Sequence, residues 1–437
     1  MTLSEGRTVL KFRYLVFSLF HPAVLKGGAQ AVAKDLFDEA REDEACSESL
    51  LLAAIDAQNF PKFDRVGASI TGLAGYESEF LLLNRTFDFF YNLVNDPRCN
   101  KAIRKLLLDF RPDVIHIHHS LFIGLDIIQL IRSVCPDAAI VYTLHEYIPI
   151  CFSCGQLFRY HEGRECKDFS PSECTRCFPH LSIDQFVARK MTFLSTFSQV
   201  DHFISPSVCL RDRFIQWGIP AGKISVIPNG HQSRRPSDFV PSHSPEVNKF
   251  GYFGQFLNAK GIDVLVSAVS DAGKRVNKRL ELDIYGGNKS YATHEFREKV
   301  EGIIKEMPSN VTVRVHGEYT RDCIFDLMAS VDWIVIPSVW PESFCLVLSE
   351  ARDARRPVLV SDIGGPGERT THMHDGICFP AGSVSGLADW ITKCAGNESL
   401  WHEIASGVTD DTSLQDTWAQ YRELFLAEVS RRQQRAR

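Results

Sequence analysis

Short apolar runs that end in glycine, serine or histidine alternate with longer helical patterns along nearly the whole chain. This alternation is typical of parallel sheets whose strands are joined by crossover helices. The chain has 437 residues, of which 44% are hydrophobic, and this is enough for two cores of ordinary size. The sequence therefore predicts an α/β protein with two doubly wound domains. The expected strands are residues 9–20, 114–118, 139–144 and 202–205 in the first domain, and 249–253, 280–285, 311–315, 333–337 and 357–361 in the second.

The domain boundary is expected after residue 230. Residues 231–247 are rich in proline and serine and have no apolar period, which is typical of a linker. The first domain is then residues 1–230, including a cysteine loop at 151–177, and the second is residues 248–410. Residues 411–437 follow a polar turn, have apolar residues at helical spacing and predict a C-terminal helix with a basic tail.

The overall charge indicates no nucleic-acid partner. The net charge is −6 and the charged fraction is 23%, as in many globular proteins. No apolar stretch approaches the roughly 20 residues of a membrane-spanning helix, and the N-terminus lacks the pattern of a signal peptide, so we expect a cytoplasmic protein. The basic tail is either a solvated helix end or a peripheral contact with anionic lipid at the inner face of the membrane. Its arginines are Arg431, Arg432, Arg435 and Arg437.

Two acids follow the strand expected at residues 333–337. We expect Glu342 in a short loop and Glu350 on a helix that begins near Phe344. Ligands of open α/β sheets bind outside the carboxyl ends of strands, and the N-terminus of a helix suits a diphosphate. Eight helical residues span about 12 Å, so the two carboxylates would accept hydrogen bonds at opposite ends of a hydroxyl-rich ligand. The alternative is a pair of solvated surface acids.

Two further loops of the second domain are punctuated by glycine. Gly254 follows the strand at residues 249–253, and Lys260 lies just before the next helix, where its ammonium suits a phosphate. Residues 362–368 contain Gly364 and Gly365 and form a third strand-to-helix loop. Three such loops in one domain favour a ligand site over packing alone.

Five cysteines lie close together at residues 151–177. Two Cys-x2-Cys pairs bracket a fifth cysteine, and in a reducing compartment this spacing indicates a metal ion, with zinc favoured by thiolate ligands. The alternative is a set of buried or free thiols without metal. The five are Cys151, Cys154, Cys166, Cys174 and Cys177.

With these motifs together, the chain resembles the retaining glycosyltransferases of family 4. The resemblance covers almost the whole chain and includes the pair Glu342 and Glu350, the loop 254–261, Gly364–Gly365 and residues 227–230. It implies the GT-B fold, in which two Rossmann-like domains face each other across a cleft. It also implies transfer of a sugar, with retention, from a nucleoside-diphosphate sugar to a hydroxyl of a glycan or lipid-linked acceptor. No Asp-x-Asp motif stands out at a strand end, which agrees with a donor site without a catalytic divalent metal.

The resemblance also implies roles for particular residues. Lys260 would bind the donor diphosphate, Glu350 the ribose and Glu342 the transferred sugar, with His145 beside that sugar. Many family members carry an arginine at the position of Gln255, so this chain lacks one expected cation. His116, His118 and His119 are expected only as a polar wall. The implied catalytic residues are His145 and Glu342, and the implied donor-binding residues are Gly27, Gly28, Gly254, Lys260, Gly286, Ser343, Phe344, Cys345, Leu346 and Glu350.

The cysteine loop is similar to that of bacterial polysaccharide and O-antigen glycosyltransferases of the same family. Their spacing implies Cys151, Cys166, Cys174 and Cys177 as ligands of a structural zinc ion, with Cys154 as the spare cysteine. It also implies a role in surface polysaccharide or lipopolysaccharide synthesis and association with other enzymes of that synthesis. Two rival functions remain. One is a retaining sugar phosphorylase or sucrose-synthase-like enzyme, of which a phosphorylase would need a pyridoxal lysine and a much longer chain. The other is a catalytically degenerate sugar-binding or scaffold protein.

Overall fold

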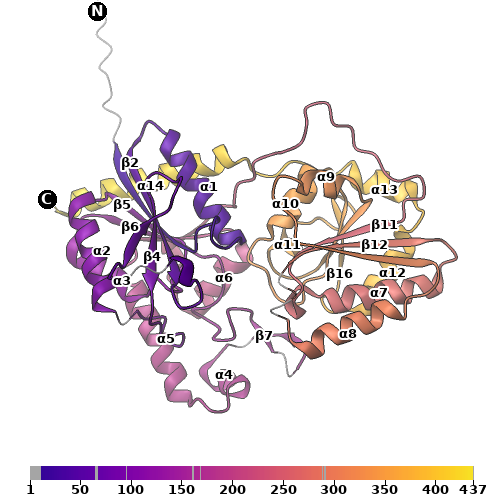
Figure 1. Ribbon diagram of the computed structural model, residues 1–437, viewed down its shortest axis with the longest axis horizontal. Coiled ribbons are helices and arrows are strands. Elements are labelled where there is room, and N and C mark those ends of the chain that lie inside the picture. The colour runs from indigo at the N-terminus through magenta and orange to yellow at the C-terminus, as the bar shows by residue number, and fades with distance from the viewer. Residues whose placement is uncertain are drawn as a thin grey trace, which may run out of the picture. The chain divides into compact units, whose positions relative to one another are not determined.

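The computed structural model describes residues 11–63, 67–94, 96–159, 162–167, 169–287, 289 and 292–436 (Figure 1). The first two residues of the strand expected at 9–20 lie outside these ranges, as does Arg437 of the basic tail. The chain divides into two compact units, each with its own sheet. The first unit comprises Met1–Phe152, Ser170–Gly230 and Leu414–Arg437, and the second comprises Ser153–Phe169 and His231–Ser413.

Within the described ranges, the first unit contains an eight-stranded sheet. All neighbouring strands are parallel except one antiparallel pair at the edge, β3 with β4. The strand order is β10 (Ile224–Val226), β9 (His202–Ser205), β6 (Ala139–Thr143), β5 (Val114–Ile117), β1 (Phe12–Leu19), β2 (Cys46–Asp56), β4 (Glu79–Asn84) and β3 (Ile70–Gly72).

The helices of the first unit form two groups. In the first group, α1 packs against the C-terminal helix α14. In the second group, α2 contacts α3, and α3 contacts α5. Their starts are marked in the sequence: Asp96 caps α2, and Ser182 with Gln185 forms a capping box at α5. The bounds are α1 (Gly28–Glu42), α2 (Pro97–Phe110), α3 (Asp126–Val134), α4 (Pro171–Cys177), α5 (Ile183–Phe197), α6 (Val208–Trp217) and α14 (Leu414–Ala436), with the 3-10 helices η1 (Pro61–Phe63) and η2 (Ala221–Lys223).

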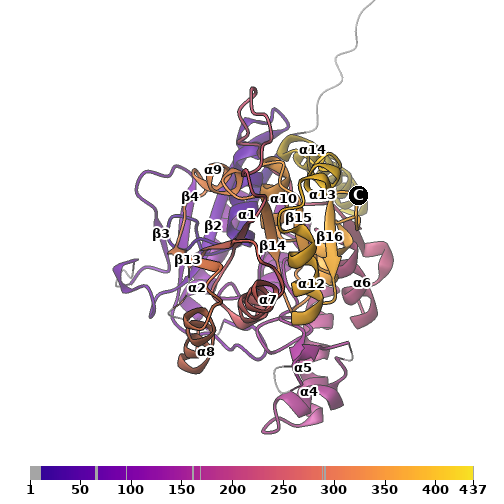
Figure 2. The ribbon, with the colours of Figure 1, turned by 90° about the vertical axis from the view of Figure 1, so that its right-hand side faces the viewer.

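In the part of the chain that is described, the second unit has a six-stranded parallel sheet and the small hairpin β7 (Phe158–Arg159) with β8 (Arg164–Glu165). Figures 1 and 2 show α7, α8 and α12 on one face of the sheet and α9 and α10 on the other. The sheet order is β13 (Val311–Gly317), β12 (Leu280–Tyr285), β11 (Lys249–Phe253), β14 (Trp333–Ile336), β15 (Val358–Ser361) and β16 (Gly376–Phe379). The helices are η3 (Asn258–Lys260), α7 (Ile262–Arg275), α8 (His294–Lys305), α9 (Ile324–Ala329), α10 (Leu346–Asp353), α11 (Gly364–Glu368), α12 (Val384–Cys394) and α13 (Glu398–Ala405).

The central strands are covered on both faces. Every residue of β5, β6, β12, β14 and β15 is buried. Continuous burial is typical of parallel strands between two helical layers, and it explains why these strands read as unbroken apolar runs. The prediction of two doubly wound α/β domains is confirmed. Among the described helices, none is both long and apolar enough to cross a membrane.

The unit boundaries differ from the expected domains at three places. The C-terminal helix α14 belongs to the first unit, because Tyr421 and Phe425 pack against aromatic residues of its sheet. Residues 153–169 of the cysteine loop belong to the second unit, whose core includes Phe158. The expected linker 231–247 also belongs to the second unit, where Asp353 and Asp332 bond its backbone.

The order of each sheet reverses once. In the first sheet the chain runs outward from β1 in one direction and from β5 in the other, and in the second sheet the corresponding strands are β11 and β14. The crevice at such a switch point, outside the carboxyl ends of the strands, is where doubly wound folds bind ligands. The loops after β1, β5, β11 and β14 are therefore the places to look for a site.

Candidate functional site

Lys260 and Glu342 meet at the switch point of the second sheet. Lys260 ends η3 in the loop after β11, and Glu342 lies in the loop after β14, as expected from the sequence. The Lys260 Nζ atom is 2.8 Å from the Glu342 Oε2 atom, and the hydroxyl of Ser338 donates to the other carboxylate oxygen. Burial lowers the pKa of Lys260, but the Glu342 carboxylate outweighs this effect and raises the pKa above its ordinary value.

The two loops that carry this ion pair are bound to each other through the backbone. The amide of Val339 donates to the carbonyl of Ala259 at 3.0 Å. Gly261 has a φ of +68° and lies so close to the Pro337 carbonyl that a Cβ atom would be 1.8 Å from its oxygen. Only glycine allows both the left-handed backbone and this approach. The position of Lys260 relative to Glu342 is therefore set by backbone contacts.

The Gly364–Gly365 turn packs against the loop of Glu342. The amide of Gly365 donates to the Glu342 carbonyl at 2.6 Å, and a Cβ atom on Gly364, whose φ is +66°, would be 2.6 Å from the Glu342 nitrogen. In the sequence this turn suggested close approach to a ligand. In the structure its glycines leave room for the backbone of residues 341–344. The turn therefore positions residues 337–345, the loop that carries Glu342 and is called the acid loop below.

Arg369 holds the chain between the acid loop and α10. Its guanidinium lies 3.6 Å from the centre of the Phe344 ring and donates to the carbonyls of Phe344 and Cys345 at 2.8 and 3.2 Å. A trans peptide points its N–H opposite to its carbonyl, so the amides of Cys345 and Leu346 face away from Arg369. The helix begins at Leu346, two residues later than expected, because Cys345 has a φ of +71°. Sequence analysis missed Arg369, and its only signal was its place just after the glycine turn.

Glu350 lies on α10 and is half-buried. Burial raises its pKa to about 7, against partial opposition from the positive charges of His231, Arg321 and Arg234. Two of those cations belong to the segment 231–247. A carboxyl with this pKa exchanges its proton near neutral pH and can both accept and donate hydrogen bonds.

Gly254 and Gly286 lie backbone to backbone. A Cβ atom on Gly286 would be 1.6 Å from the Gly254 carbonyl oxygen, and the Gly254 amide donates to Tyr285 at 3.0 Å. The loop after β11 thus rests on the end of β12. The carbonyl of Gln255, in the same loop, accepts a 2.7 Å hydrogen bond from Tyr252.

Three histidines and one tyrosine form a hydrogen-bonded chain in the first unit. His145 Nε2 is 2.9 Å from His118 Nδ1, His118 Nε2 is 3.1 Å from His116 Nδ1, and Tyr14 bonds the same His116 nitrogen at 2.7 Å. The rings of His118 and His145 are stacked. Because each ring nitrogen either donates or accepts, the protons of the three histidines can point from His116 toward His145 or in the reverse direction, and Tyr14 shares the one His116 nitrogen with His118. His145 therefore presents either a lone pair or an N–H at its outer nitrogen, Nδ1.

The rings of this chain are neutral near pH 7. Burial lowers the pKa of His145 to about 4, and it lowers the pKa values of His116 and His118 well below the ordinary value. The next residue, Glu146, was not singled out from the sequence. Burial raises its pKa to about 8, although the amide of Ile148 bonds its carboxyl and the positive charge of Arg189 opposes the rise.

Gly27 precedes the first helix of the same unit. It is the N-terminal cap residue of α1, and the helix starts at Gly28 without a side-chain cap or an acid in its first turn. A Cβ atom on Gly27 would be 2.3 Å from the Gln30 amide oxygen. The N–H groups at the start of α1 form the positive end of a helix dipole beside β1.

Two of the proposed zinc ligands lie close to one buried guanidinium in the first unit. Burial lowers the pKa of Arg189 to about 10, and Coulombic interaction with Cys151 and Cys174 opposes this effect. Cys174 and Cys177 lie on α4 of this unit, whereas Cys166 belongs to the second unit. The four-cysteine ligand set stays a prediction.

Two family models match adjoining parts of the chain. The family described as glycosyltransferase family 4 matches residues 82–235, and the family described as glycosyl transferases group 1 matches residues 233–407. The second match contains Lys260, Glu342 and Glu350, and the first contains His145. The two matches support a glycosyltransferase of the group 1 and family 4 type.

Individual relatives agree with this assignment. An uncharacterized glycosyltransferase of Methanocaldococcus jannaschii is 28% identical over 56% of this chain and 64% of its own length. Lipopolysaccharide 1,2-N-acetylglucosaminetransferase of Salmonella typhimurium is 27% identical over 38% of this chain and 45% of its own length. The chain thus spans less than two thirds of the length of each relative.

Solved structures identify the architecture. The Anabaena protein HepE, solved in complex with UDP and glucose, superimposes with a TM-score of 0.65 at 18% identity, covering 95% of this chain and 100% of HepE. At this identity the likeness concerns the fold. The two Rossmann-like units with parallel sheets are those of the GT-B fold, so the fold class expected from the sequence is confirmed.

Proposed function

Because the chain is of the group 1 and family 4 glycosyltransferase type, we propose that it is a retaining enzyme that uses a nucleoside-diphosphate sugar as donor. The sugar would pass to a hydroxyl of a glycan or of a lipid-linked glycan. The observation that carries this proposal is the Lys260–Glu342 ion pair, 2.8 Å long, at the switch point of the second sheet. It puts a cation for phosphate next to an acceptor for sugar hydroxyls.

In this proposal the second unit binds the donor. Lys260 exchanges its contact with Glu342 for one with the diphosphate, and Glu342 then accepts hydrogen bonds from the sugar. The backbone amides of Ser343, Phe344, Cys345 and Leu346 face the phosphate and the sugar, supported by the contacts of Arg369 and Gly365 on the opposite side. Glu350 binds the ribose, and the Gly254 and Gly286 backbone lets the nucleotide approach closely.

Retention limits the chemistry that these residues can perform. A double displacement would need a nucleophile on the sugar face opposite the leaving group. We propose substitution on the same face instead, in which the leaving phosphate takes the proton of the acceptor hydroxyl. Lys260 and the amides before α10 would stabilise the charge that develops on that phosphate, and no catalytic divalent metal is required.

The first unit would supply His145 and the start of α1. A neutral His145 can accept a hydrogen bond from a sugar hydroxyl or donate one, because its chain of histidines can reverse. Gly27 and Gly28 would contact the donor phosphate through backbone N–H groups.

We also propose a structural zinc ion on Cys151, Cys166, Cys174 and Cys177. Thiolates would fill all four positions, so this ion would brace the loop and leave no site for water. The name of the Salmonella relative supports an acceptor in surface polysaccharide synthesis. In that setting the protein would work beside other polysaccharide-synthesis enzymes and contact the membrane peripherally.

The first test is a donor screen with the purified full chain. Ligands that bind only the folded state raise its unfolding temperature, and the nucleotide sugars to compare are UDP-, GDP- and ADP-linked. HepE was solved in complex with UDP, which makes UDP-sugars the first choice. The active pair of donor and acceptor is then assayed for transfer, and NMR of the product reports the anomeric configuration. An inverted product would refute retention.

A second candidate is a catalytically degenerate sugar-binding or scaffold protein. Gln255, in place of an arginine of the family, is the observation in its favour. This candidate predicts a thermal shift with a nucleotide sugar but neither donor hydrolysis nor transfer. Gln255→Arg separates the candidates further, because transfer that appears only in this variant would favour the degenerate candidate, whereas transfer by the wild type would refute it.

A further inference from the structure

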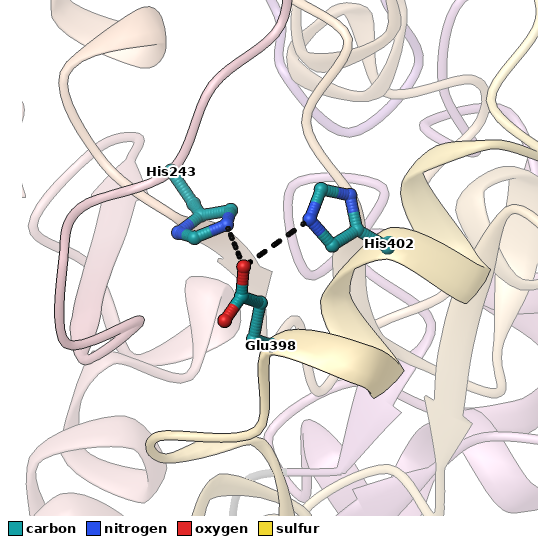
Figure 3. Close-up of side chains that lie close together, drawn as sticks. All are labelled: His243, Glu398 and His402. Carbon is teal, nitrogen blue, oxygen red and sulfur yellow. Dashed lines mark ion pairs between the residues drawn. The ribbon is translucent and has the colours of Figure 1, made fainter.

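We propose that His243, Glu398 and His402 form a binding site for a transition metal ion, with Zn²⁺ as the best-suited ion. The three residues lie in the second unit, and their side chains point toward one another (Figure 3). His243 comes from the segment 231–247, and the other two lie one turn apart on α13. The family matches assign no role to them.

The distances fit a tetrahedral ion. Glu398 Oε1 lies 3.3 Å from His243 Nε2 and 3.6 Å from His402 Nε2, and all three ligand atoms lie within 4.8 Å of one another. Two ligands bound at about 2.0–2.1 Å to a tetrahedral zinc ion are about 3.3–3.4 Å apart. Two imidazoles and one carboxylate are also the donor set that suits borderline metals, and they leave one position for water.

The tautomer of His243 is the one that binds a metal. Its Nδ1 lies 2.8 Å from the carbonyl oxygen of Ser244, and a carbonyl can only accept, so Nδ1 carries the proton. In the neutral ring, Nε2 then points its lone pair at the Glu398 carboxylate, a repulsive arrangement that a cation between them would relieve. Histidine ligands of metals commonly donate their other N–H to a backbone carbonyl in this way.

Asp332 holds both sides of the site in place. Its carboxylate accepts from the amide and the hydroxyl of Ser244, each at 2.6 Å, and its backbone carbonyl accepts from the Trp401 indole at 2.9 Å. Ser244 and Trp401 are the direct neighbours of His243 and His402. Because one buried residue fixes both neighbours, the two imidazoles are positioned before any ion binds.

The three side chains are exposed enough for an ion to reach them from solvent. The side chains of Glu398 and His402 are 67% and 61% exposed, whereas that of His243 is 16% exposed. The ion would enter from solvent and join the segment 231–247 to α13. Trp401 contacts both imidazoles edge to face, with ring centres 5.0 Å from His243 and 5.2 Å from His402, so its fluorescence reports on the site.

The test is titration of the untagged full-length protein with Zn²⁺ and with Ni²⁺, after its initial metal content has been measured. We expect one additional equivalent of bound metal, a rise in unfolding temperature and quenching of tryptophan fluorescence by Ni²⁺. His243→Ala and His402→Ala should each weaken this binding by about ten-fold or more, and Glu398→Gln should weaken it less.

Two controls separate this site from other metal-binding groups. His294 and Glu298 on α8 form a similar exposed pair at helical spacing, 3.2 Å apart, so His294→Ala should leave the affinity unchanged. Cys174→Ser with Cys177→Ser tests the cysteine loop and should leave the additional equivalent in place. Equal stoichiometry and affinity in the wild type and in the His243→Ala/His402→Ala double variant would refute the proposal, as would loss of the equivalent only in the cysteine variant.

Discussion

Lys260 and Glu342 belong to loops on either side of the point where the order of the second sheet reverses, and their charged atoms are 2.8 Å apart. In the absence of donor, Lys260 and Glu342 therefore hold each other in place. On donor binding, each would release the other. This arrangement keeps both groups in the orientation that the proposed reaction needs, and it avoids leaving a buried carboxylate without a cation.

Lys260→Met should lower transfer activity by about 100-fold or more, because a stabilising charge on the leaving phosphate is lost. It should also lower the free energy of unfolding by about 1–3 kcal/mol, since the buried Glu342 carboxyl loses its 2.8 Å partner. The double variant Lys260→Met/Glu342→Gln should recover stability without recovering activity. Lys299→Met, which removes a 2.7 Å ion pair with Asp263, is the matched control and should retain activity. Full activity in Lys260→Met would refute the donor assignment.

The carboxyl of Glu350 should make stability depend on pH. Its folded pKa of about 7 exceeds the ordinary value of 4.5, so its contribution is complete below pH 4.5 and is lost as the pH rises through 7. Glu350→Gln should therefore raise the unfolding temperature at pH 8 relative to the wild type and have little effect at pH 4.5. Thermal unfolding at the two pH values checks this expectation.

Glu403→Gln on α13 replaces an exposed acid and should show no such difference. If both variants respond equally, the effect does not come from Glu350. The same Glu350→Gln protein should bind the nucleotide donor more weakly, because the proposed ribose contact loses its charge.

His145→Asn should lower transfer by about 100-fold, and His118→Asn by less, since His118 acts through its hydrogen bond to His145. The folded pKa of His145, about 4, lies below the ordinary value of 6.5. Its contribution to stability is therefore complete above pH 6.5 and is lost as the pH falls toward 4. Unfolding of His145→Asn should depend less on pH across that range.

Kinetics of both variants and urea unfolding between pH 4 and 7.5 measure these effects. His202→Asn is the control for losing a histidine from the same sheet, where His202 bonds Ser225 at 2.8 Å. Equal losses in the three variants would indicate a general effect on folding.

Gly364→Ala should disturb the acid loop. The added Cβ atom would be 2.6 Å from the Glu342 nitrogen, and the φ of +66° disfavours alanine, so we expect a loss of about 1–3 kcal/mol in stability and weaker donor binding. Gly382→Ala has a similar φ of +75°, but its nearest contact is at 3.9 Å. It should cost stability through strain alone and leave the donor affinity, measured by calorimetry, unchanged.

The purified protein should contain one zinc ion on its cysteine loop. Cys174→Ser should abolish that ion and lower the unfolding temperature, because a thiolate ligand is lost. Cys154→Ser removes the spare cysteine and should keep the metal. Elemental analysis of both variants checks the assignment, and a wild type without zinc after purification in zinc-containing medium would contradict it.

Several features followed from the sequence because they depend on local chemistry. Fully buried parallel strands such as β6 and β12 read as apolar runs, which was enough for the fold class. Strands β2 and β4 were missed, since neither ends in the glycine, serine or histidine that marked the others. Lys260 and Glu342 were each expected beyond the carboxyl end of a strand, because parallel strands bring their ends to one edge.

Tertiary structure alone decided which of these groups meet. The Lys260–Glu342 contact, the hold of Arg369 on the acid loop and the packing of α14 on the first unit all join segments far apart in the chain. The same is true of His243 and His402, whose neighbours Ser244 and Trp401 both donate hydrogen bonds to Asp332. The sequence by itself determined the strands, the loops and the residue types at their ends, because these follow from local periodicity and backbone preference. Side-chain partners follow from packing between elements, which local spacing does not encode.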